Sequence, residues 1–408
     1  MKTSYLCLML HDKEDDKLKI IANRLELLSA AQDAERLVPA CSPLEILQCT
    51  YLAAENRKIK VAVCNADLVL ERNIPVEVCE AGCMVIRAHL LSTMLRQLDG
   101  DDVTIECSKK GVATVSSGNA TYRIPIMDAD NFPRQEIPSP DFTVSVTGIP
   151  AMAKRTVFAA SNETTSKPQM RCVHMVFSES GTHAVSGDGY RVAYVRGETG
   201  YDRLIDILMP ASSLKALAGL VSNQDMLQVG TTGKQAVFQK DGFIFSAKLM
   251  EGDPIDADYL MRQIQSRFSV LTDADVLRHA LSSVTSVSGH QTRLSFNFLG
   301  SRLQMNSDSE NGKSSITIDV VPLSGGPQGE FWYDPEKLVE CIRAQTGTLI
   351  LEIAQNGILI MKTDKLVCVL NGMRKTRPAE IKEQRMKTAR RPAKRTAQKQ
   401  TDTADSAA

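Results

Sequence analysis

The sequence is short of aromatic residues, of net charge and of long apolar runs. Aromatic side chains make up 5% of the 408 residues, with one tryptophan, and 48 Lys and Arg balance 48 Asp and Glu. The most apolar run near the N-terminus, residues 5–10, is far shorter than the ~18 to 20 residues of a membrane-spanning helix. Residues 11–17 (HDKEDDK) stand where a secretory signal needs small residues. The short apolar run and the charged residues that follow it predict a protein with no membrane span and no secretory signal.

The sequence also lacks the motifs of common enzymes and metal sites. It has no Cys-x-x-Cys, Gly-x-Ser-x-Gly, His-Glu-x-x-His or dinucleotide fingerprint, and GTTGK at 230–234 is too short for a phosphate-binding loop. The six histidines have no ligand spacing; His174 and His183 could meet across a hairpin, but a hydrogen-bonded strand histidine is the favoured interpretation. The sequence therefore predicts a non-catalytic protein with no cofactor and no metal.

Ten cysteines lie mostly inside apolar, strand-like runs. This placement favours buried free thiols in a reducing cytoplasm. A thiol-dependent enzyme stays an open alternative, which rests on the cysteine count alone.

The balanced charge hides a division along the chain. Residues 375–408 hold ten Lys and Arg against four Asp and Glu, which leaves 38 basic and 44 acidic residues in 1–374. The tail has almost no large apolar residue, so the sequence predicts a disordered basic tail and an acidic body. Such a tail favours polyanions, although solubility alone would also explain it.

A repeat of about 62 residues runs through the body, which is long enough for two to four domains. Short amphipathic stretches, each followed by alternating strand-like runs, recur at intervals of 61 to 63 residues. Asp273 and Asp334 stand at helix N-cap positions, and Pro210 and Pro335 stand near first turns. One apolar residue from each predicted helix marks the repeat: Leu28, Leu91, Met152, Leu214, Leu277 and Leu338.

The runs between the helices alternate in polarity like antiparallel strands, as at 103–107, 112–116, 122–126, 316–321 and 349–353. Helices separated by such runs indicate an α+β fold. Acidic, proline-containing connectors at 128–133 and 252–259 pair the six repeats into three similar domains of two helices each. The predicted divisions are an N-terminal extension 1–17, domains 18–138, 139–258 and 259–374, and the tail 375–408.

The stretch SGDGYRVAY at 186–194 predicts a tight turn followed directly by a strand. Gly187 and Gly189 allow positive φ or close backbone approach, and Asp188 can bond its own backbone. Alternation puts Val192 on one face of the strand and Arg191 on the other. Taken alone, the stretch is more typical of an ordinary hairpin turn than of a binding edge.

In its context this stretch resembles the second domain of the bacterial DNA polymerase III beta subunits, the sliding clamps. In that family the sequence at this place is usually close to Thr-Asp-Gly-His-Arg-Leu-Ala. The resemblance covers roughly residues 18–374 and rests on the order and spacing of several motifs. These are DADNFP at 128–133, SNETTSKP at 161–168, MRCVHMVF at 170–177, SGDGYRVA at 186–193, LMEGDPIDADY at 249–259, WYDPEKLVECIRA at 332–344 and VLNGMR at 369–374.

The resemblance implies a non-catalytic processivity factor, a head-to-tail homodimeric ring that encircles duplex DNA without reading its sequence. Helices line the hole of such a ring and sheets form its outside. A nucleoid-associated location follows, with the polymerase III alpha subunit, the clamp loader and other clamp-binding peptides as partners. The alternative is a clamp-like scaffold that binds partner peptides without encircling DNA.

The resemblance also implies three sets of site residues. The partner-peptide pocket would comprise Cys172, Gly187, Gly189, Tyr190, Arg191, Val192, Met261, Arg262, Val369, Leu370, Asn371, Gly372, Met373 and Arg374. The DNA-facing residues would be Arg36, Arg96, Lys154, Arg155, Lys167, Lys215, Arg278 and Arg343, although a solvated helix face would also explain them. The dimer contact would pair Tyr122 and Ile124 with the region of Val287.

Three departures from the family pattern fall in the pocket. Tyr190 stands where the family has His, Asn371-Gly372 replaces Met-Pro, and Cys172 is smaller than the usual Leu. We expect a more polar rim and an altered fit for the standard peptide. Ser286 and Ser288 likewise make the expected dimer patch more polar.

Overall fold

The structure is a computed structural model that describes residues 18–108, 111–286 and 293–373. The predicted N-terminal extension and basic tail lie outside the described residues. The α-helices of the described chain are α1 (Arg24–Leu37), α2 (Ala88–Gln97), α3 (Ile149–Thr156), α4 (Ala211–Ala218), α5 (Ala257–Gln263), α6 (Ala274–Thr285) and α7 (Pro335–Arg343). No described helix is long and apolar enough to cross a membrane.

Six of these helices carry the repeat predicted from the sequence. All six marker residues fall in α1, α2, α3, α4, α6 and α7, and these helices pack in pairs, α1 with α2, α3 with α4 and α6 with α7. The predicted caps are confirmed: the carboxylates of Asp273 and Asp334 accept backbone N–H groups at the starts of α6 and α7. Pro335 occupies the first turn of α7, where its missing N–H costs nothing.

All pairings between the described strands are antiparallel, and these strands form four sheets, so the α+β prediction is confirmed. In spatial order, the first sheet is β5 (Glu77–Glu80), β1 (Leu18–Asn23), β7 (Asp102–Ser108), β8 (Val112–Ser117) and β9 (Ala120–Pro125). The second is β10 (Val144–Val146), β15 (Leu227–Thr231), β16 (Gln235–Lys240), β17 (Phe243–Lys248), β4 (Leu68–Pro75), β3 (Lys58–Cys64), β2 (Cys49–Glu55) and β6 (Gly82–Arg87).

The third and fourth sheets contain the rest of the described strands. The third is β14 (Ile205–Pro210), β11 (Cys172–Ser178), β12 (Gly181–Gly187), β13 (Arg191–Gly197), β26 (Val367–Leu370), β25 (Leu359–Lys362), β24 (Thr348–Ala354), β18 (Ser266–Asp273) and β22 (Val321–Ser324). The fourth is β21 (Gly312–Asp319), β20 (Arg302–Ser309), β19 (Arg293–Leu299) and β23 (Gln328–Tyr333).

Two of the sheets join segments that are far apart in the sequence. In the second sheet β17 pairs with β4, from Phe243 opposite Arg72 to Ala247 opposite Leu68. In the third sheet β13 pairs with β26. We call these two places the first junction and the second junction. The domain boundaries near 139 and 259 stay predictions, and the strand hydrogen bonds run across the divisions that they would make.

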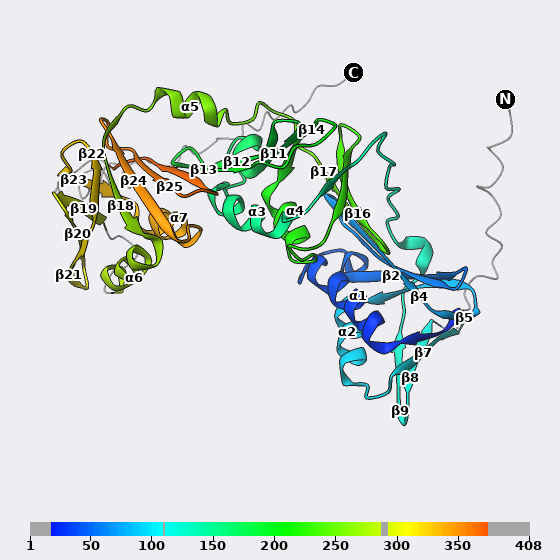
Figure 1. Ribbon diagram of the computed structural model, residues 1–408. Helices are drawn as coiled ribbons and strands as arrows, with labels where there is room; N and C mark the ends of the chain where they lie inside the picture. Colours follow the sequence, from blue (N-terminus) through cyan, green and yellow to red (C-terminus); the bar gives the residue numbers. More distant parts are fainter. Residues whose placement is uncertain (1–17, 109–110, 287–292, 374–408) are drawn as a thin grey trace, which may run out of the picture.

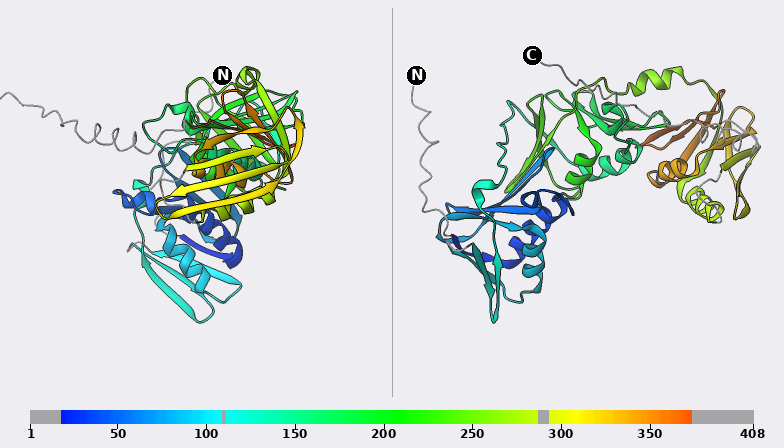
Figure 2. Two further views of the ribbon diagram at one scale, coloured as in Figure 1. Left: turned by 90° about the vertical axis from the view of Figure 1, so that its left-hand side faces the viewer. Right: turned by 180° about the vertical axis from the view of Figure 1, so that it is seen from behind.

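The described chain forms an open arc (Figure 1). The six paired helices lie along its concave side, and the sheets form its convex side, as the view from behind also shows (Figure 2). Strand β9 lies at one end of the arc and β21 at the other, and each is the edge strand of its sheet. This arrangement puts helix surfaces inside the arc and strand edges at its ends.

The predicted strands are confirmed except at two places. Residues 122–126 are shifted, because β9 ends at Pro125, and the predicted run 316–321 is split between β21 and β22. Helix α5 begins inside the second connector, runs four residues past its end at 259, and was not predicted. Its start is marked by Asp256, whose carboxylate accepts the Tyr259 N–H at 2.8 Å.

Candidate functional site

A groove lies at the second junction, between α5 and the turn before β26. It has a volume of about 550 Å³, within the usual range of ligand sites. Its lining comprises Tyr194, Arg196, Asp258, Met261, Arg262, Thr363, Asp364, Lys365, Leu366 and Val367. We call it the second-junction groove.

An apolar cluster continues from this groove along β13. Val185, Tyr194 and Ala257 are buried, and Val192, Ile255 and Val367 pack against them. The connector that carries Ile255 and α5 therefore lies on the outer face of the third sheet. The inner face belongs to the main core, which includes Ala193 and Val195. The alternation predicted along 191–195 is confirmed by this division.

The turn before β13 has the predicted construction. The Asp188 carboxylate accepts the N–H groups of Tyr190 and Arg191 at 2.9 and 3.0 Å, and Gly189 adopts a φ of +87°. Gly187 serves a close approach: a Cβ there would lie 2.8 Å from the Arg191 carbonyl oxygen and 3.0 Å from Ile255 Cδ1. The glycines thus fix the turn and admit the connector.

The turn and the terminal strand lie side by side, as the resemblance implies. Arg191 pairs with Leu370, and Val192 with Val369. Beyond β26, the Asn371 N–H donates to the Tyr190 carbonyl at 2.9 Å, and its side-chain amide donates to the Gly189 carbonyl at 3.2 Å. The exposed side chains of Tyr190 and Met373 border this end of the site. Arg374 lies outside the described residues.

Arg191 does not line the groove. Its guanidinium is buried on the opposite face of the sheet, 2.5 Å from Glu340 of α7, and donates to the Phe158 carbonyl at 2.6 Å. Asp188 lies 3.3 Å from its Nε. Burial acts to lower the pKa of Arg191, but the hydrogen bond and the charge of Glu340 outweigh burial and raise that pKa. Arg191 is therefore an internal strut between β13 and α7.

The predicted pocket residues on α5 and on β11 differ in whether they line the groove. Met261 and Arg262 line the groove from α5. Cys172 is buried at the start of β11, its thiol donates to the Pro168 carbonyl, and burial raises its pKa to about 11. The sequence interpretation missed Tyr194, Arg196, Asp258 and residues 363–367. The signal for Tyr194 was present, because it lies two residues after Val192 on the same strand face.

Polar contacts fix one wall of the groove. The Tyr194 hydroxyl lies 3.2 Å from His183 Nδ1 and donates to Asp258 at 3.3 Å. Arg196 pairs with Asp258 and donates to the Tyr194 hydroxyl. Burial, the largest influence, raises the pKa of Tyr194, so this hydroxyl stays protonated. His183 thus faces Tyr194, and His174 pairs with Asp206 at 2.8 Å, so the two histidines do not meet.

The predicted DNA-facing residues differ in how free their charges are. Arg36 lies 3.6 Å from Asp33 and donates to the Gly219 carbonyl beside α4, while Arg278 pairs with Asp275 and donates to the Gln345 carbonyl. Arg96 lies 3.9 Å from Glu35. Lys167 precedes the short 3-10 helix Pro168–Arg171 and belongs to none of the six paired helices.

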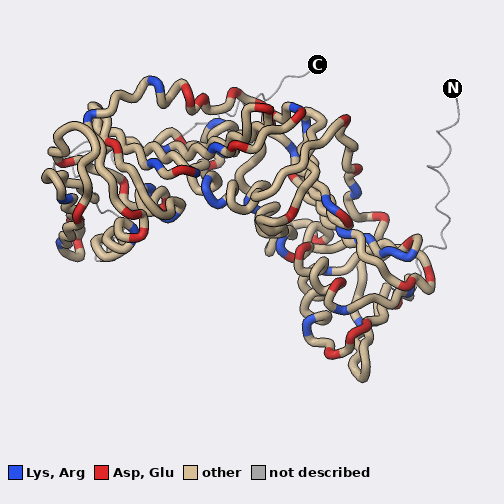
Figure 3. Tube along the Cα trace, in the orientation of Figure 1, with Lys and Arg blue, Asp and Glu red and all other residues tan. Residues whose placement is uncertain are grey.

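Four predicted cations on the concave helices have no ion pair among the described residues: Lys154, Arg155, Lys215 and Arg343. Lys and Arg appear as separate blue segments of the tube in Figure 3. Helices α3 and α4 carry no Asp or Glu, whereas α7 also carries Glu336 and Glu340. The positive charges on α3 and α4 therefore have no acidic neighbour on their own helix.

No group of three or more His, Cys, Asp or Glu side chains in the described ranges could hold a metal ion. Of the nine cysteines in the described part of the chain, six are buried, Cys41 and Cys79 are exposed and Cys83 is half-buried. Burial of most thiols agrees with the structural interpretation made from the sequence.

The described chain has the fold of the sliding clamps. A putative DNA polymerase III beta subunit from Eubacterium rectale superposes with a TM-score of 0.81 at 18% identity, over 87% of this chain and 99% of that one. A Pseudomonas aeruginosa sliding clamp bound to griselimycin superposes with a TM-score of 0.79 at 18% identity, over 88% and 99%. These likenesses establish the fold.

The chain is also similar in sequence to the DNA polymerase III beta subunits. Residues 18–137 match the family model of the DNA polymerase III beta subunit, N-terminal domain. The beta sliding clamp of Halalkalibacterium halodurans is 23% identical over 59% of this chain and 67% of its own length, and that of Synechococcus elongatus is 21% identical over 76% and 83%. The resemblance to the bacterial DNA polymerase III beta subunits is confirmed.

One substitution tests the packing of the turn against the connector. We expect Gly187→Ala to lower the stability by about 1 to 3 kcal/mol, because the new Cβ overlaps the Arg191 carbonyl and Ile255. Gly326→Ala is the matched control, since a Cβ there meets nothing within 4 Å. Thermal unfolding of both variants checks this, and equal midpoints would contradict the close approach.

Proposed function

We propose that this protein is a DNA sliding clamp, a non-catalytic processivity factor in which two copies close head to tail around duplex DNA. The observation that carries the proposal is the arc, with six paired helices on its concave side and an edge strand at each end. Each chain would contribute three domains, 18–138, 139–258 and 259–374. It would act in the cytoplasm at the nucleoid.

The two ends of the arc are suited to pair with each other. Strand β9 hydrogen-bonds only to β8, and β21 only to β20, among the described strands. An open edge presents unpaired N–H and C=O groups that another strand can satisfy. Tyr122 and Ile124 of β9 are half-buried against the core, which supports β9 as half of the contact. Val287, the predicted partner region, lies outside the described residues.

The helices on the concave side are suited to contact duplex DNA in a way that does not depend on base sequence. Separate cations can screen phosphates without fixing the protein in one place, and an acidic body limits non-specific adhesion. The hold on DNA would then be topological.

Two measurements test this proposal. Light scattering gives the mass of the chain in solution, and a loading reaction with the clamp loader followed by gel filtration gives retention on nicked circular DNA. We expect a dimer that stays on circles and is lost when the circle is cut. A strict monomer that never stays on circles would contradict the clamp.

We further propose that the second-junction groove and its adjoining apolar cluster bind an extended apolar peptide from the polymerase alpha subunit, the clamp loader and other partners. The supporting observation is an apolar floor, Val192, Ile255 and Val367, bordered by charged side chains. Pockets of this kind bind extended segments through alternate side chains.

A substitution in α5 tests the peptide site. We expect Met261→Glu to weaken binding of a labelled polymerase-derived peptide at least tenfold, because it places a carboxylate in the groove. Met226→Glu, at a side chain that is 60% exposed, is the matched control. Fluorescence anisotropy measures both, and unchanged affinity for Met261→Glu would remove the groove from the site.

The alternative is a scaffold that binds peptides but does not encircle DNA. The observation that favours it is the pairing of Arg36, Arg96 and Arg278 with acidic neighbours, which lowers the positive charge available to DNA. Peptide binding without any loader-dependent retention on circles would select the scaffold.

A further inference from the structure

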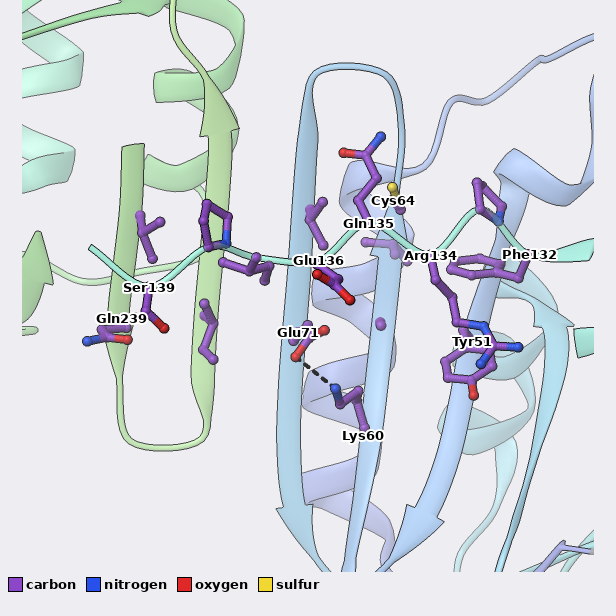
Figure 4. Close-up of a pocket in the computed structure, with 18 of the residues that line it drawn as sticks. Tyr51, Lys60, Cys64, Glu71, Phe132, Arg134, Gln135, Glu136, Ser139 and Gln239 are labelled. Atoms are coloured by element: carbon purple, nitrogen blue, oxygen red, sulfur yellow. Dashed lines mark ion pairs between the residues drawn. The ribbon is translucent and has the colours of Figure 1, made fainter. Parts of the chain in front are cut away.

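A second groove lies at the first junction, where the connector at 132–140 crosses the outer face of the second sheet (Figure 4). Its volume is about 560 Å³. The connector forms one wall, and strands β3, β4, β16 and β17 form the floor. We call it the first-junction groove. It includes no residue of the second-junction groove.

The two grooves have the same construction. Each lies on the outer face of a sheet that joins distant segments, beneath a proline-containing connector. Each connector also anchors an apolar side chain to that face: Phe132 stacks on Tyr51 at 5.4 Å in one, and Ile255 packs on Gly187 in the other. The first-junction groove is thus the internal counterpart of the proposed peptide site.

The lining of the first-junction groove favours an uncharged ligand. Val63, Val237 and Ile244 supply apolar floor. The charges on the floor are already matched, since Lys60 lies 3.1 Å from Glu71. The guanidinium of Arg134 lies over the Tyr51 ring at 5.3 Å and 3.6 Å from Asp130. The connector also brings Glu136 to the lining, so Lys60 and Arg134 balance Glu71 and Glu136 and the lining has no net charge. Such a groove gains little from a charged ligand and much from burial of apolar side chains.

The chain itself carries an uncharged apolar segment that lies outside the described residues. Residues 5–10 read YLCLML. Successive side chains of an extended segment point to opposite sides, so Leu6, Leu8 and Leu10 would share one side. We propose that residues 5–10 bind in the first-junction groove of the same chain, with these three leucines in the groove.

The attachment point of the segment permits this docking. A path from Leu18 along β1 to Lys19, across its pairing with Glu80, along the chain to Cys83, and across β2 to Lys60 is about 28 Å long, at roughly 4.8 Å per strand spacing and 3.4 Å per residue. The straight distance is no longer than this path. The eight residues from Leu10 to Leu18 span up to about 26 to 29 Å. Attachment to the same chain also gives a high effective concentration.

A photocrosslinking experiment on the full chain tests the proposal. A benzophenone side chain is placed at position 8, and crosslinked peptides are identified by mass spectrometry. We expect crosslinks to residues 132–140 and to the β16–β17 hairpin, within one chain when isotopically light and heavy chains are mixed. Position 3, outside the apolar run, is the matched position for the photoreactive group.

Substitutions in the two grooves test where residues 5–10 bind. We expect Ile244→Glu, at a half-buried side chain of the first-junction groove, to reduce the crosslink yield at least tenfold. Met261→Glu, its matched control in the second-junction groove, leaves the yield unchanged. If circular dichroism shows that Ile244→Glu is unfolded, Ile137→Asp on the connector replaces it.

The remaining outcomes each overturn the proposal. Crosslinks to residues 363–367 or to α5 would make the segment a ligand of the second-junction groove. Crosslinks only between chains, or no reproducible crosslink, would show that the segment does not bind its own first-junction groove. Retention on circular DNA is measured separately with Leu6→Ser and Leu10→Ser combined, and we expect it to be unchanged. The inference and the proposed function can therefore fail independently.

Discussion

Replacement of Arg191 with alanine is expected to lower the free energy of unfolding by about 3 kcal/mol. The substitution removes the charge that Asp188 and Glu340 share and leaves the Phe158 carbonyl without its donor. Loss of one member of a buried ion pair costs roughly 3 to 5 kcal/mol, and the half-exposed Glu340 puts this case at the lower end. Chemical denaturation measures the loss.

Arg196→Ala is the matched control for this prediction. Its side chain is 59% exposed, on the same strand, and it also pairs with a carboxylate, that of Asp258. Exposed pairs contribute roughly 0 to 1 kcal/mol, so the control stays close to the unmodified protein. Equal losses for the two variants would contradict the role of Arg191 as a strut. A loss of peptide affinity by folded Arg191→Ala would instead place this residue in the peptide site.

Removal of the four unpaired cations of the concave helices is expected to weaken the salt dependence of DNA association. The variant combines Lys154→Ser, Arg155→Ser, Lys215→Ser and Arg343→Ser. Each lost phosphate contact lowers the slope of log affinity against log salt by roughly 0.9, so four contacts lower it by about 3 to 4. Binding to short duplex DNA across a salt series measures the slope.

The control for this prediction takes the same number of cations from the turns and strand ends of the second sheet. It combines Arg57→Ser, Lys58→Ser, Lys234→Ser and Lys248→Ser, all at exposed positions. Because this variant has the same net charge, a general attraction would change both slopes equally. An effect confined to the first variant supports the concave side as the DNA-facing surface, and equal slopes would contradict it.

The sequence predicted the helices well because their signals are local. Leu27, Ala31, Ala34 and Leu37 mark the buried face of α1 at helical spacing, and Asn23 caps it by accepting the N–H groups of Leu25 and Glu26. A resemblance supported by several spaced motifs then predicted the fold class. The helix α5 was missed because its seven residues lie in a connector that shows no repeat.

The shared sheets could not be predicted in the same way. The pairing of β17 with β4 joins Phe243 to Arg72, and no local signal specifies which of many alternating strands will be neighbours. The orientation of Arg191 could not be predicted for the same reason, because it depends on contacts with distant segments. Alternation separated Arg191 from Val192, but only the path of the connector decides which face becomes the groove.

The continuous strand pairing at both junctions has a consequence for how DNA could enter the proposed ring. Opening the chain at the first junction would break the β17–β4 ladder, and opening it at the second would break the β13–β26 ladder and separate Arg191 from Glu340. The outer edges of β9 and β21 pair with no other described strand, so no ladder within a chain would break there. A clamp loader would therefore open the proposed ring at the contact between subunits. Each chain would move as one rigid body.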